Sequence, residues 1–219
     1  MDLYEYIHKF FNKQERFNFP YNIELIENFT CKNGLYVLFE KGELFNEYDR
    51  IVRIGSHDGN NCLVKRLKDH FLANKQRNSI FRKHLGRCLL NKEQDPYLCA
   101  WNKPFKKIKD KEKYKDIVDL EYEKKYENLI SNYIRQNLSF CLIPKIYNKQ
   151  ERDKIEEGLV AILSQSTLKK SSDNWLGNWH PDCRIRESKI WNLEYLNGDK
   201  LNLEEFKKLI ESRYCLSSI

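Results

Sequence analysis

The chain of 219 residues has no long apolar run, which excludes a membrane-spanning helix. Its longest apolar stretches are about five residues, such as 35–39 and 159–163, whereas a span needs roughly 20. The opening MDLYEYIHKFF carries acids where a signal peptide has a basic start followed by an apolar stretch. Glycine (8) and proline (5) are too few for collagen-like or low-complexity chains. We therefore expect a cytoplasmic protein with no membrane partner.

The seven cysteines are scattered, and none forms the CxxC pair typical of structural zinc sites. Without a secretion signal a disulfide framework is not expected either, so we interpret the cysteines as free thiols. The chain is 41% hydrophobic and 13% aromatic, which argues against disorder. Its net charge is +7, which makes nucleic acid the first partner to consider.

Short apolar segments predict the strands of a small sheet. Residues 35–39 and 49–54 predict a hairpin, with the polar residues 40–48 as a long loop, and 138–146 predicts a third strand. Helical periodicity predicts helices over 60–72 with Asn60 or Asn61 as cap, 79–90 with Ser79 as cap, and 150–163 with Asn148 as cap. The fold class is therefore α+β, with a three-stranded, antiparallel-type sheet flanked by helices.

The chain divides into three parts. We expect an N-terminal lead-in over 1–33 that holds a helix and a strand, a core over 34–164, and a C-terminal extension over 165–219 that packs on the core. The extension contains three of the four tryptophans, Trp175, Trp179 and Trp191.

A charged segment over about 91–137 interrupts the core. Its residues 103–113 are mostly basic, and the apolar residues after them predict an amphipathic helix; these are Ile117, Leu120, Ile130 and Ile134. The segment is either a solvated helical insertion or a basic arm that lies on DNA.

Residues 60–92 hold nearly the whole positive excess, with nine Lys or Arg against the single acid Asp69. Such a block can form an electrostatic footprint for a phosphate backbone. The alternative is a solvated helix face whose charges pair with acids elsewhere. The side chains expected to bind nucleic acid are Arg53, Lys65, Lys68, Lys75, Arg77, Arg82 and Lys83.

Several residue types suit chemistry on a phosphodiester. Arg66 and His70 are four apart on one predicted helix, so they share a face. Arginine stabilises developing negative charge, and histidine can donate or accept a proton. Glu156 lies in an otherwise apolar helix, and a single carboxylate can hold Mg²⁺ together with waters and substrate oxygens. Tyr36 on the first strand is either a proton relay or part of the core.

The order of these features resembles the GIY-YIG nuclease family. The segments that carry the resemblance are GLYVLFE (34–40), RIVRIGSHDG (50–59), LVKRLKDH (63–70), SIFRKHLG (79–86) and IEEGLVAILS (155–164). SSDNWLGNW and IRESKIWN look like the C-terminal signature of a prokaryotic branch of the family. The similarity covers roughly 34–90 and 138–195, with the charged segment as an insertion.

The resemblance implies a nuclease core over 34–164 that cuts DNA with one divalent metal ion. It implies Tyr36 as the proton acceptor from water, Arg66 as the group that stabilises the phosphorane, and His70 as its partner. Glu156 corresponds to the metal-binding glutamate, because it precedes the Leu159–Val160 pair by the family's spacing.

Two positions of the family pattern are less direct. The late asparagine is matched to Asn174, with Asn192 as the alternative. Arg53 replaces the tyrosine of the second motif, and His57, two residues past the glycine, is the natural substitute, since a neutral imidazole can accept a proton. His57 is otherwise a turn residue that caps the helix.

We therefore predict a DNA endonuclease that uses one Mg²⁺ or Mn²⁺ ion, held by Glu156, to hydrolyse phosphodiester bonds. The DNA is expected to be double-stranded, and the sequence leaves a homodimer open. A non-catalytic nucleic-acid-binding module on the same fold is the alternative, suggested by Arg53 in place of tyrosine.

Overall fold

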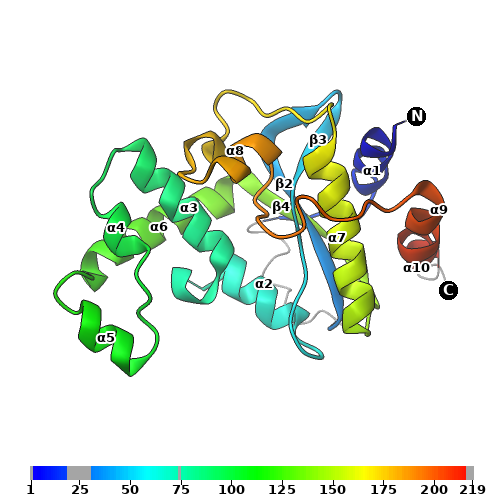
Figure 1. The fold of residues 1–219 in the computed structure, drawn as a ribbon. Helices are drawn as coiled ribbons and strands as arrows, with labels where there is room; N and C mark the ends of the chain where they lie inside the picture. Colours follow the sequence, from blue (N-terminus) through cyan, green and yellow to red (C-terminus); the bar gives the residue numbers. More distant parts are fainter. Residues whose placement is uncertain (1, 19–30, 74, 216–219) are drawn as a thin grey trace.

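The computed structural model describes residues 2–18, 31–73 and 75–215 (Figure 1). Its centre is an antiparallel sheet with the strand order β1-β4-β2-β3, so the α+β prediction is confirmed. The strands are β1 (Phe17–Asn18), β2 (Gly34–Phe45), β3 (Tyr48–Gly55) and β4 (Leu138–Pro144). The two-residue β1 lies in the lead-in, where a strand was predicted, and it joins the predicted three-stranded sheet as a fourth strand. β3 lies at one edge of the sheet.

The hairpin differs from the prediction, because most of residues 40–48 are strand rather than loop. β2 continues to Phe45 and β3 begins at Tyr48, which leaves Asn46 and Glu47 as the turn. Asn46 adopts a φ of 52°, a left-handed conformation that asparagine tolerates in tight turns. The polar residues of this stretch predicted a loop, but Glu40 and Glu43 are buried in the strand and have hydrogen-bond or ion-pair partners.

Both faces of the sheet are covered, which explains why β2 is apolar at consecutive positions. Leu35, Val37 and Phe39 pack against α1 (Leu3–Phe11) and α7 (Lys149–Gln165). The alternate residues Tyr36 and Leu38 belong to a second core, which includes side chains of α2 (Leu63–Phe71), α3 (Ile80–Lys92) and α6 (Leu120–Asn137). The sheet is therefore the middle layer of three.

The predicted helix caps are correct at two of the three helices. The side chains of Ser79 and Asn148 accept backbone N–H groups at the starts of α3 and α7. At α2 the cap position is Cys62, which makes no side-chain capping bond. The prediction of Asn60 or Asn61 was wrong, because the Asn61 side chain instead accepts a hydrogen bond of 2.7 Å from Asn33.

The charged insertion folds as a helical lobe beside the sheet (Figure 1). It contains α4 (Leu98–Trp101), α5 (Ile108–Tyr114) and α6, and the short η2 (Gln76–Asn78) lies just before α3. Ile130 and Ile134 of α6 are buried as predicted, whereas Ile117 and Leu120 are 50% and 57% exposed. The amphipathic helix thus begins to bury its apolar face later than predicted.

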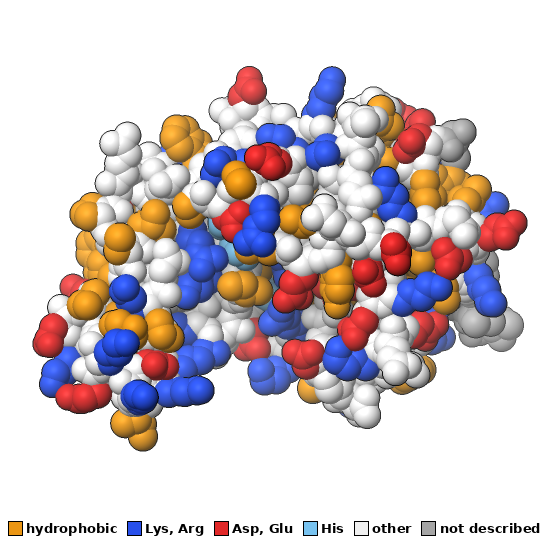
Figure 2. Space-filling view, in the orientation of Figure 1, with side chains coloured by type: hydrophobic (Ala, Val, Ile, Leu, Met, Phe, Trp, Pro, Cys, Tyr) orange, Lys and Arg blue, Asp and Glu red, His pale blue; other side chains and the backbone are white. Residues whose placement is uncertain are grey.

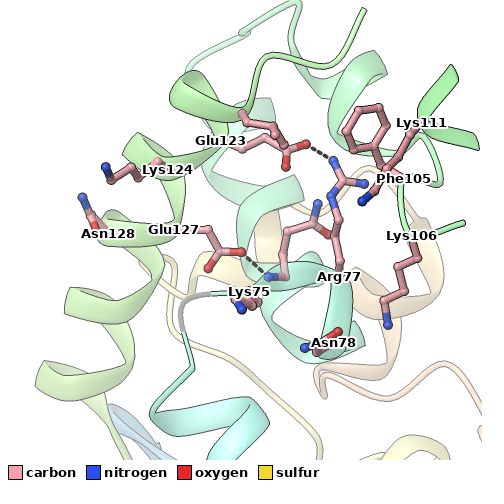
Figure 3. A pocket seen from close by; sticks show the side chains of 12 residues that line it. Lys75, Arg77, Asn78, Phe105, Lys106, Lys111, Glu123, Lys124, Glu127 and Asn128 are labelled. Atoms are coloured by element: carbon pink, nitrogen blue, oxygen red, sulfur yellow. Dashed lines mark hydrogen bonds and ion pairs between the residues drawn. The ribbon is translucent and has the colours of Figure 1, made fainter. Parts of the chain in front are cut away.

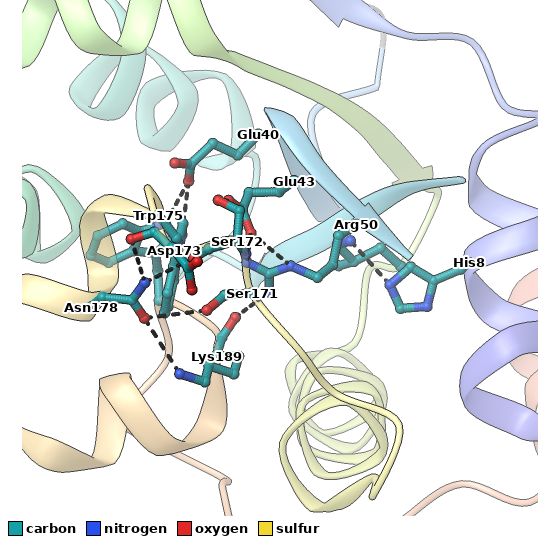
Figure 4. A network of polar contacts seen from close by, with 12 residues as sticks. His8, Glu40, Glu43, Arg50, Ser171, Ser172, Asp173, Trp175, Asn178 and Lys189 are labelled. Atoms are coloured by element: carbon teal, nitrogen blue, oxygen red, sulfur yellow. Dashed lines mark hydrogen bonds and ion pairs between the residues drawn. The ribbon is translucent and has the colours of Figure 1, made fainter. Parts of the chain in front are cut away.

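The C-terminal extension packs against the hairpin (Figure 4). Its short helices are η3 (Leu176–Trp179), α8 (Cys183–Ser188), α9 (Leu203–Phe206), η4 (Lys207–Glu211) and α10 (Ser212–Cys215). Buried Glu40 accepts hydrogen bonds from the indole N–H groups of Trp175 and Trp191, at 3.2 and 3.1 Å. Trp179 is 44% exposed. None of the described helices is long and apolar enough to cross a membrane.

Candidate active site

A cavity of about 540 Å³ opens where the layers meet at the end of β3. Figure 2 shows this face of the molecule, hollowed between the helical lobe and α7, with a histidine side chain visible inside. Side chains from five parts of the chain line it: Arg53, Ser56, His57 and Asp58 after or within β3, Arg66 of α2, Ile80 and His84 of α3, Lys149, Asp153 and Glu156 of α7, and 191–195 of the extension.

Tyr36 and His70 lie behind this cavity and contact each other. Both are buried, and the Tyr36 hydroxyl lies 2.8 Å from Nε2 of His70. The same oxygen accepts a hydrogen bond of 3.2 Å from Nε of Arg53. Two predicted site residues therefore meet the residue that replaces the second tyrosine, and Arg53 links Tyr36 to the cavity that it lines.

His70 is a neutral imidazole in this setting. Burial, with the charges of Arg66, Arg53 and Arg82, lowers its pKa well below the usual range. Its Nδ1 lies 2.6 Å from the hydroxyl of Ser79, so both ring nitrogens have hydroxyl partners. His70 can therefore orient Tyr36 without bringing a charge.

Gly55 is required by the close approach of Tyr36. The two residues are paired across β2 and β3, and a Cβ atom on Gly55 would lie 2.2 Å from the tyrosine hydroxyl oxygen. Any side chain at this position would displace the tyrosine. The glycine of the second motif thus makes room for the tyrosine of the first.

Arg66 is the cation of the cavity that has no partner of its own. It makes no hydrogen bond or ion pair with another described residue, and its Nε is buried without an acceptor. A buried unsatisfied donor is costly, and a phosphate oxygen is an acceptor that would satisfy it. This geometry suits the predicted role of Arg66 as a phosphate ligand.

Glu156 reaches the cavity from α7 and accepts a hydrogen bond from the Ser56 hydroxyl. Burial raises the pKa of its carboxyl, while the Ser56 hydrogen bond and the charge of Arg53 oppose the shift. In the described part of the chain no three His, Cys, Asp or Glu side chains converge as a closed metal cage. A single half-buried carboxylate such as that of Glu156 fits Mg²⁺, which commonly keeps several waters and binds substrate phosphates.

His57 lines the cavity, but its geometry does not suit a general base. Its Nε2 accepts the backbone N–H of Gly34 at 3.3 Å, so in the neutral ring the proton is on Nδ1. Burial, and then the charge of Arg152, lowers the pKa of His57 and favours this neutral form. Nδ1 is buried and has no hydrogen-bond partner among the described residues. His57 is thus arranged to donate a hydrogen bond rather than to accept a proton.

Of the two candidates for the late asparagine, the structure brings the alternative, Asn192, to the cavity and not Asn174. Asn174 is exposed and does not line the cavity, whereas Asn192 does. The Asn192 side chain donates to the carbonyl of Ile54 at 2.8 Å and accepts its N–H at 3.2 Å. This pairing with the edge strand β3 fixes Asn192 at the cavity wall. The extension has no periodic pattern that would have separated the two asparagines in the sequence.

The predicted nucleic-acid contacts divide into exposed and internal residues. Arg82 is fully buried and bonded to Glu127 at 2.6 Å, so it is not available to DNA and that prediction was wrong. Arg77 is paired with Glu123 in the same way. Lys83 is half-buried, and its burial, with the charges of Arg87 and Arg77, lowers its pKa to about 8.

The three remaining lysines are exposed or half-buried, whereas Arg53 is internal. Lys65 and Lys75 are exposed, Lys68 is half-buried on α2, and Lys65 forms an ion pair of 2.9 Å with Asp69. Arg53 is buried, and its Nη1 donates to the Trp191 carbonyl at 2.5 Å. The positive block of residues 60–92 is therefore partly structural.

Two basic pockets adjoin the cavity on the side of the insertion, and Figure 3 shows the side chains that line one of them. Ile80 lines both the cavity and a neighbouring pocket of about 440 Å³. That pocket adjoins another of about 590 Å³, and the two share the residues Gln76, Arg77, Asn78, Phe105 and Lys106. Around Phe105 these pockets hold lysines without ion pairs to other described residues: Lys75, Lys103, Lys106, Lys107 and Lys111. We call this surface the lysine groove.

Several cavity residues were missed by the sequence reasoning, among them Ser56, His84 and Glu194. Ser56 contacts Glu156, His84 lines the wall formed by α3, and Glu194 lies near Glu156, whose pKa its charge helps to raise. The position of Ser56, directly after the second-motif glycine, and that of His84, within the segment 79–86 that resembles the family, offered a signal. His84 and Glu194 reach the cavity only through the packing of α3 and of the extension.

A guanidinium without a partner among the described residues, a half-buried carboxylate and a tyrosine behind them define a site suited to phosphodiester chemistry. Comparison with known protein families matches residues 2–214 to the GIY-YIG domain. The chain therefore belongs to the GIY-YIG domain family, which implies nuclease activity with DNA as the partner. No curated protein and no solved structure matches the chain.

Proposed function

We propose that the protein is a divalent-metal-dependent endonuclease that hydrolyses phosphodiester bonds of double-stranded DNA. The observation that carries the proposal is the convergence of Arg66, without a partner, and Glu156 in one cavity. Tyr36 lies directly behind it, connected through Arg53. Together with family membership, this arrangement supports hydrolysis rather than binding alone.

Glu156 is the residue that would hold the metal ion, Mg²⁺ or Mn²⁺, with one ion in each site. When bound, such an ion neutralises charge on the scissile phosphate as a Lewis acid. Ser56 orients the carboxylate through its hydrogen bond, so one carboxylate oxygen has a fixed direction. Arg53 and Arg66 add positive charge near Glu156, and both shift its pKa downward.

The protein's own residues bind and orient the DNA phosphate. Arg66 donates to the non-bridging oxygens and stabilises the negative charge that grows as water attacks. Tyr36 takes the proton from that water while its own hydroxyl proton passes to Nε2 of His70, 2.8 Å away, and Nε of Arg53 donates to the same oxygen. His57 contributes a hydrogen bond from Nδ1 instead of acting as the base. Asn192 keeps the β3 end of the cavity in place.

The lysine groove supplies a path for the duplex next to the cut. Its lysines carry charge that no described acid pairs, as a phosphate backbone requires. A single cavity in each chain cuts one strand at a time, so a monomer would accumulate nicked plasmid. A homodimer would instead produce linear plasmid directly.

The deciding experiment is cleavage of supercoiled plasmid with Mg²⁺ by the wild type, Glu156→Ala and Glu157→Ala. We expect Glu156→Ala to lose cleavage by at least 10²-fold, on the scale of removing a charge-stabilising group, while it still binds DNA. Glu157, the next residue of α7, does not line the cavity and is the matched control. If the wild type binds DNA in a salt-sensitive way but does not cut it, the result would instead support the non-catalytic module. That alternative was suggested by Arg53 in place of the second tyrosine.

A further inference from the structure

His84 and His180 form a buried pair of imidazoles in the cavity wall. His84 is on α3 and His180 follows η3 of the extension, and they are 2% and 1% exposed. Nδ1 of His84 lies 2.9 Å from Nε2 of His180. His84 lines the same cavity as Arg66 and Glu156. The pair therefore connects the extension to the site through one hydrogen bond between rings.

The neighbours of the pair determine where its protons lie. The backbone N–H of Asp182 lies 3.0 Å from Nδ1 of His180, so this nitrogen accepts and the proton is on Nε2. That Nε2–H then donates to Nδ1 of His84, which Arg87 also approaches as a donor at 3.2 Å. The opposite arrangement would rely on a 3.4 Å bond from His180 to the Asp182 carbonyl. In that arrangement Nδ1 of His84 would carry a proton, and this N–H would face the N–H of Arg87 that lies 3.2 Å away.

Both rings remain neutral at physiological pH. Burial, and the charges of His180 and Arg87, lower the pKa of His84 well below its usual range. Burial lowers the pKa of His180 to about 4. A neutral His84 with Nδ1 occupied carries its single proton on Nε2, the one polar atom of the ring that has no partner among the described residues.

We propose that His84 donates a hydrogen bond from Nε2 to a phosphate oxygen of the DNA substrate, and that His180 holds the ring in the tautomer that can do so. The inference rests on the proposed function, because it places a further donor in the same cavity. His84 is the substrate-binding group, and His180 is a positioning residue. The extension thus takes part in the chemistry because its His180 keeps the proton of His84 on Nε2.

This donor has a different character from the two arginines of the site. A neutral N–H adds directed hydrogen bonding without further cationic charge next to Arg53 and Arg66. Such a donor stabilises charge that develops in the transition state, and loss of one donor of this kind lowers turnover by roughly 10²-fold.

Variants of His84 separate donation from packing. The amide nitrogen of glutamine lies near the position of Nε2, whereas that of asparagine lies near Nδ1. We expect His84→Asn to lose about 10²-fold in kcat with DNA affinity within roughly threefold, and His84→Gln to recover at least about tenfold of this loss. Asn91→Ala is the matched control, because Asn91 also joins α3 to the extension, at the Trp179 carbonyl, outside the cavity. Equal turnover of wild type and both His84 variants would overturn the proposal.

Nitrogen-15 NMR of the histidine rings tests the proton positions without any cleavage. The wild type should show His84 as the neutral Nε2–H tautomer from pH 6 to 8, and the Nε2 signal should shift when a short DNA duplex is added without divalent metal. His180→Phe should leave the His84 ring exchanging between tautomers. A His84 signal of the Nδ1–H or charged form, or one unaffected by DNA, would refute the proposal. If the wild type never cuts DNA, the proposed function fails while this measurement still decides the tautomer.

Discussion

At the scale of single residues, Arg53 does more than fill the place of the second tyrosine. Its Nε donates to the Tyr36 hydroxyl and its Nη1 donates to the Trp191 carbonyl, so one side chain joins the first strand to the extension. A lysine has a single nitrogen and can make only one of these contacts from the same position. The departure from the family pattern is thus compensated by a residue with two separated donors.

We therefore expect Arg53→Lys to retain the fold and to lose activity by at least tenfold. Loss of one buried hydrogen bond should lower the free energy of unfolding by about 1–2 kcal/mol. Plasmid cleavage and urea unfolding measure the two effects. Arg184→Lys, an exposed arginine of α8, is the control and should leave both unchanged. Full activity of Arg53→Lys would show that the bridge to Tyr36 is dispensable.

His8 makes the stability of the fold depend on pH. Its Nδ1 donates to the Tyr4 carbonyl at 2.8 Å and its Nε2 accepts the Ile51 N–H at 3.1 Å, so the ring must be neutral. Burial lowers its pKa to about 4. Because the unfolded chain then takes up the proton first, this contribution is complete above about pH 6.5 and is lost as the pH falls toward 4.

The expected loss is roughly 1–3 kcal/mol between pH 7 and pH 4 from this residue. Urea unfolding at a series of pH values measures this loss. His8→Gln should lower the slope of the unfolding free energy against pH, in the range between pH 6.5 and 4, by an amount that corresponds to about one bound proton. The other four histidines also have lowered pKa values, and they contribute to the slope of the unfolding free energy against pH in the wild type and in His8→Gln alike. An identical slope in wild type and variant would contradict the assignment to His8.

At the scale of elements, a buried ion pair attaches the extension to the hairpin (Figure 4). Arg50 of β3 and Glu43 of β2 are 1% and 3% exposed and lie 2.6 Å apart. Glu43 also accepts the backbone N–H of Ser172 at 3.1 Å and the hydroxyl of the same residue. The hairpin segment that resembled a loop is therefore where the extension is bonded.

Removing one partner of this pair should be more harmful than removing both. Arg50→Met leaves the Glu43 carboxylate buried without its cation, which should cost about 3–5 kcal/mol of unfolding free energy. Adding Glu43→Gln removes the buried charge and should restore part of that loss. Urea unfolding of the two single variants and the double variant measures the coupling. Strictly additive losses would mean that the two side chains act independently.

Local patterns predicted the elements of the fold well, and they failed where distant contacts decide the outcome. The spacing of Arg66 and His70 and the caps Ser79 and Asn148 depend on neighbours within a helical turn. Arg82 looked like a surface charge because its partner Glu127 lies 45 residues further along the chain. Asn192 was only the alternative for a similar reason, since its partner Ile54 is 138 residues away.

At the scale of the whole molecule, positive charge without ion pairs to described acids gathers on the insertion beside the cavity, where it adds to Arg66 and Lys75 of residues 60–92. Arg77 and Arg82 are neutralised by the insertion's own glutamates, while the lysines of the lysine groove are not paired with described acids. Of the two interpretations of the insertion, this distribution favours the arm that lies on DNA.

Reversing charge in the lysine groove should therefore weaken DNA binding. We expect Lys106→Glu combined with Lys107→Glu to lower affinity by about 10–100-fold at low salt, and to reduce the dependence of log K on log salt by about one unit per lost contact. Lys208→Glu changes an exposed lysine of η4, on the opposite side of the molecule (Figure 1), and is the control. Equal losses in the two proteins would mean that the groove has no special role.

The contacts of residues 191–192 with β3 have a consequence for self-association. The Trp191 N–H donates to the Val52 carbonyl at 2.7 Å, and the Asn192 side chain occupies both backbone groups of Ile54. These residues cover an open sheet margin that another polypeptide could otherwise extend as an added strand. Asn192→Ala should thus increase the light scattering of concentrated solutions. The asparagine that lines the cavity would then also protect the protein from aggregation.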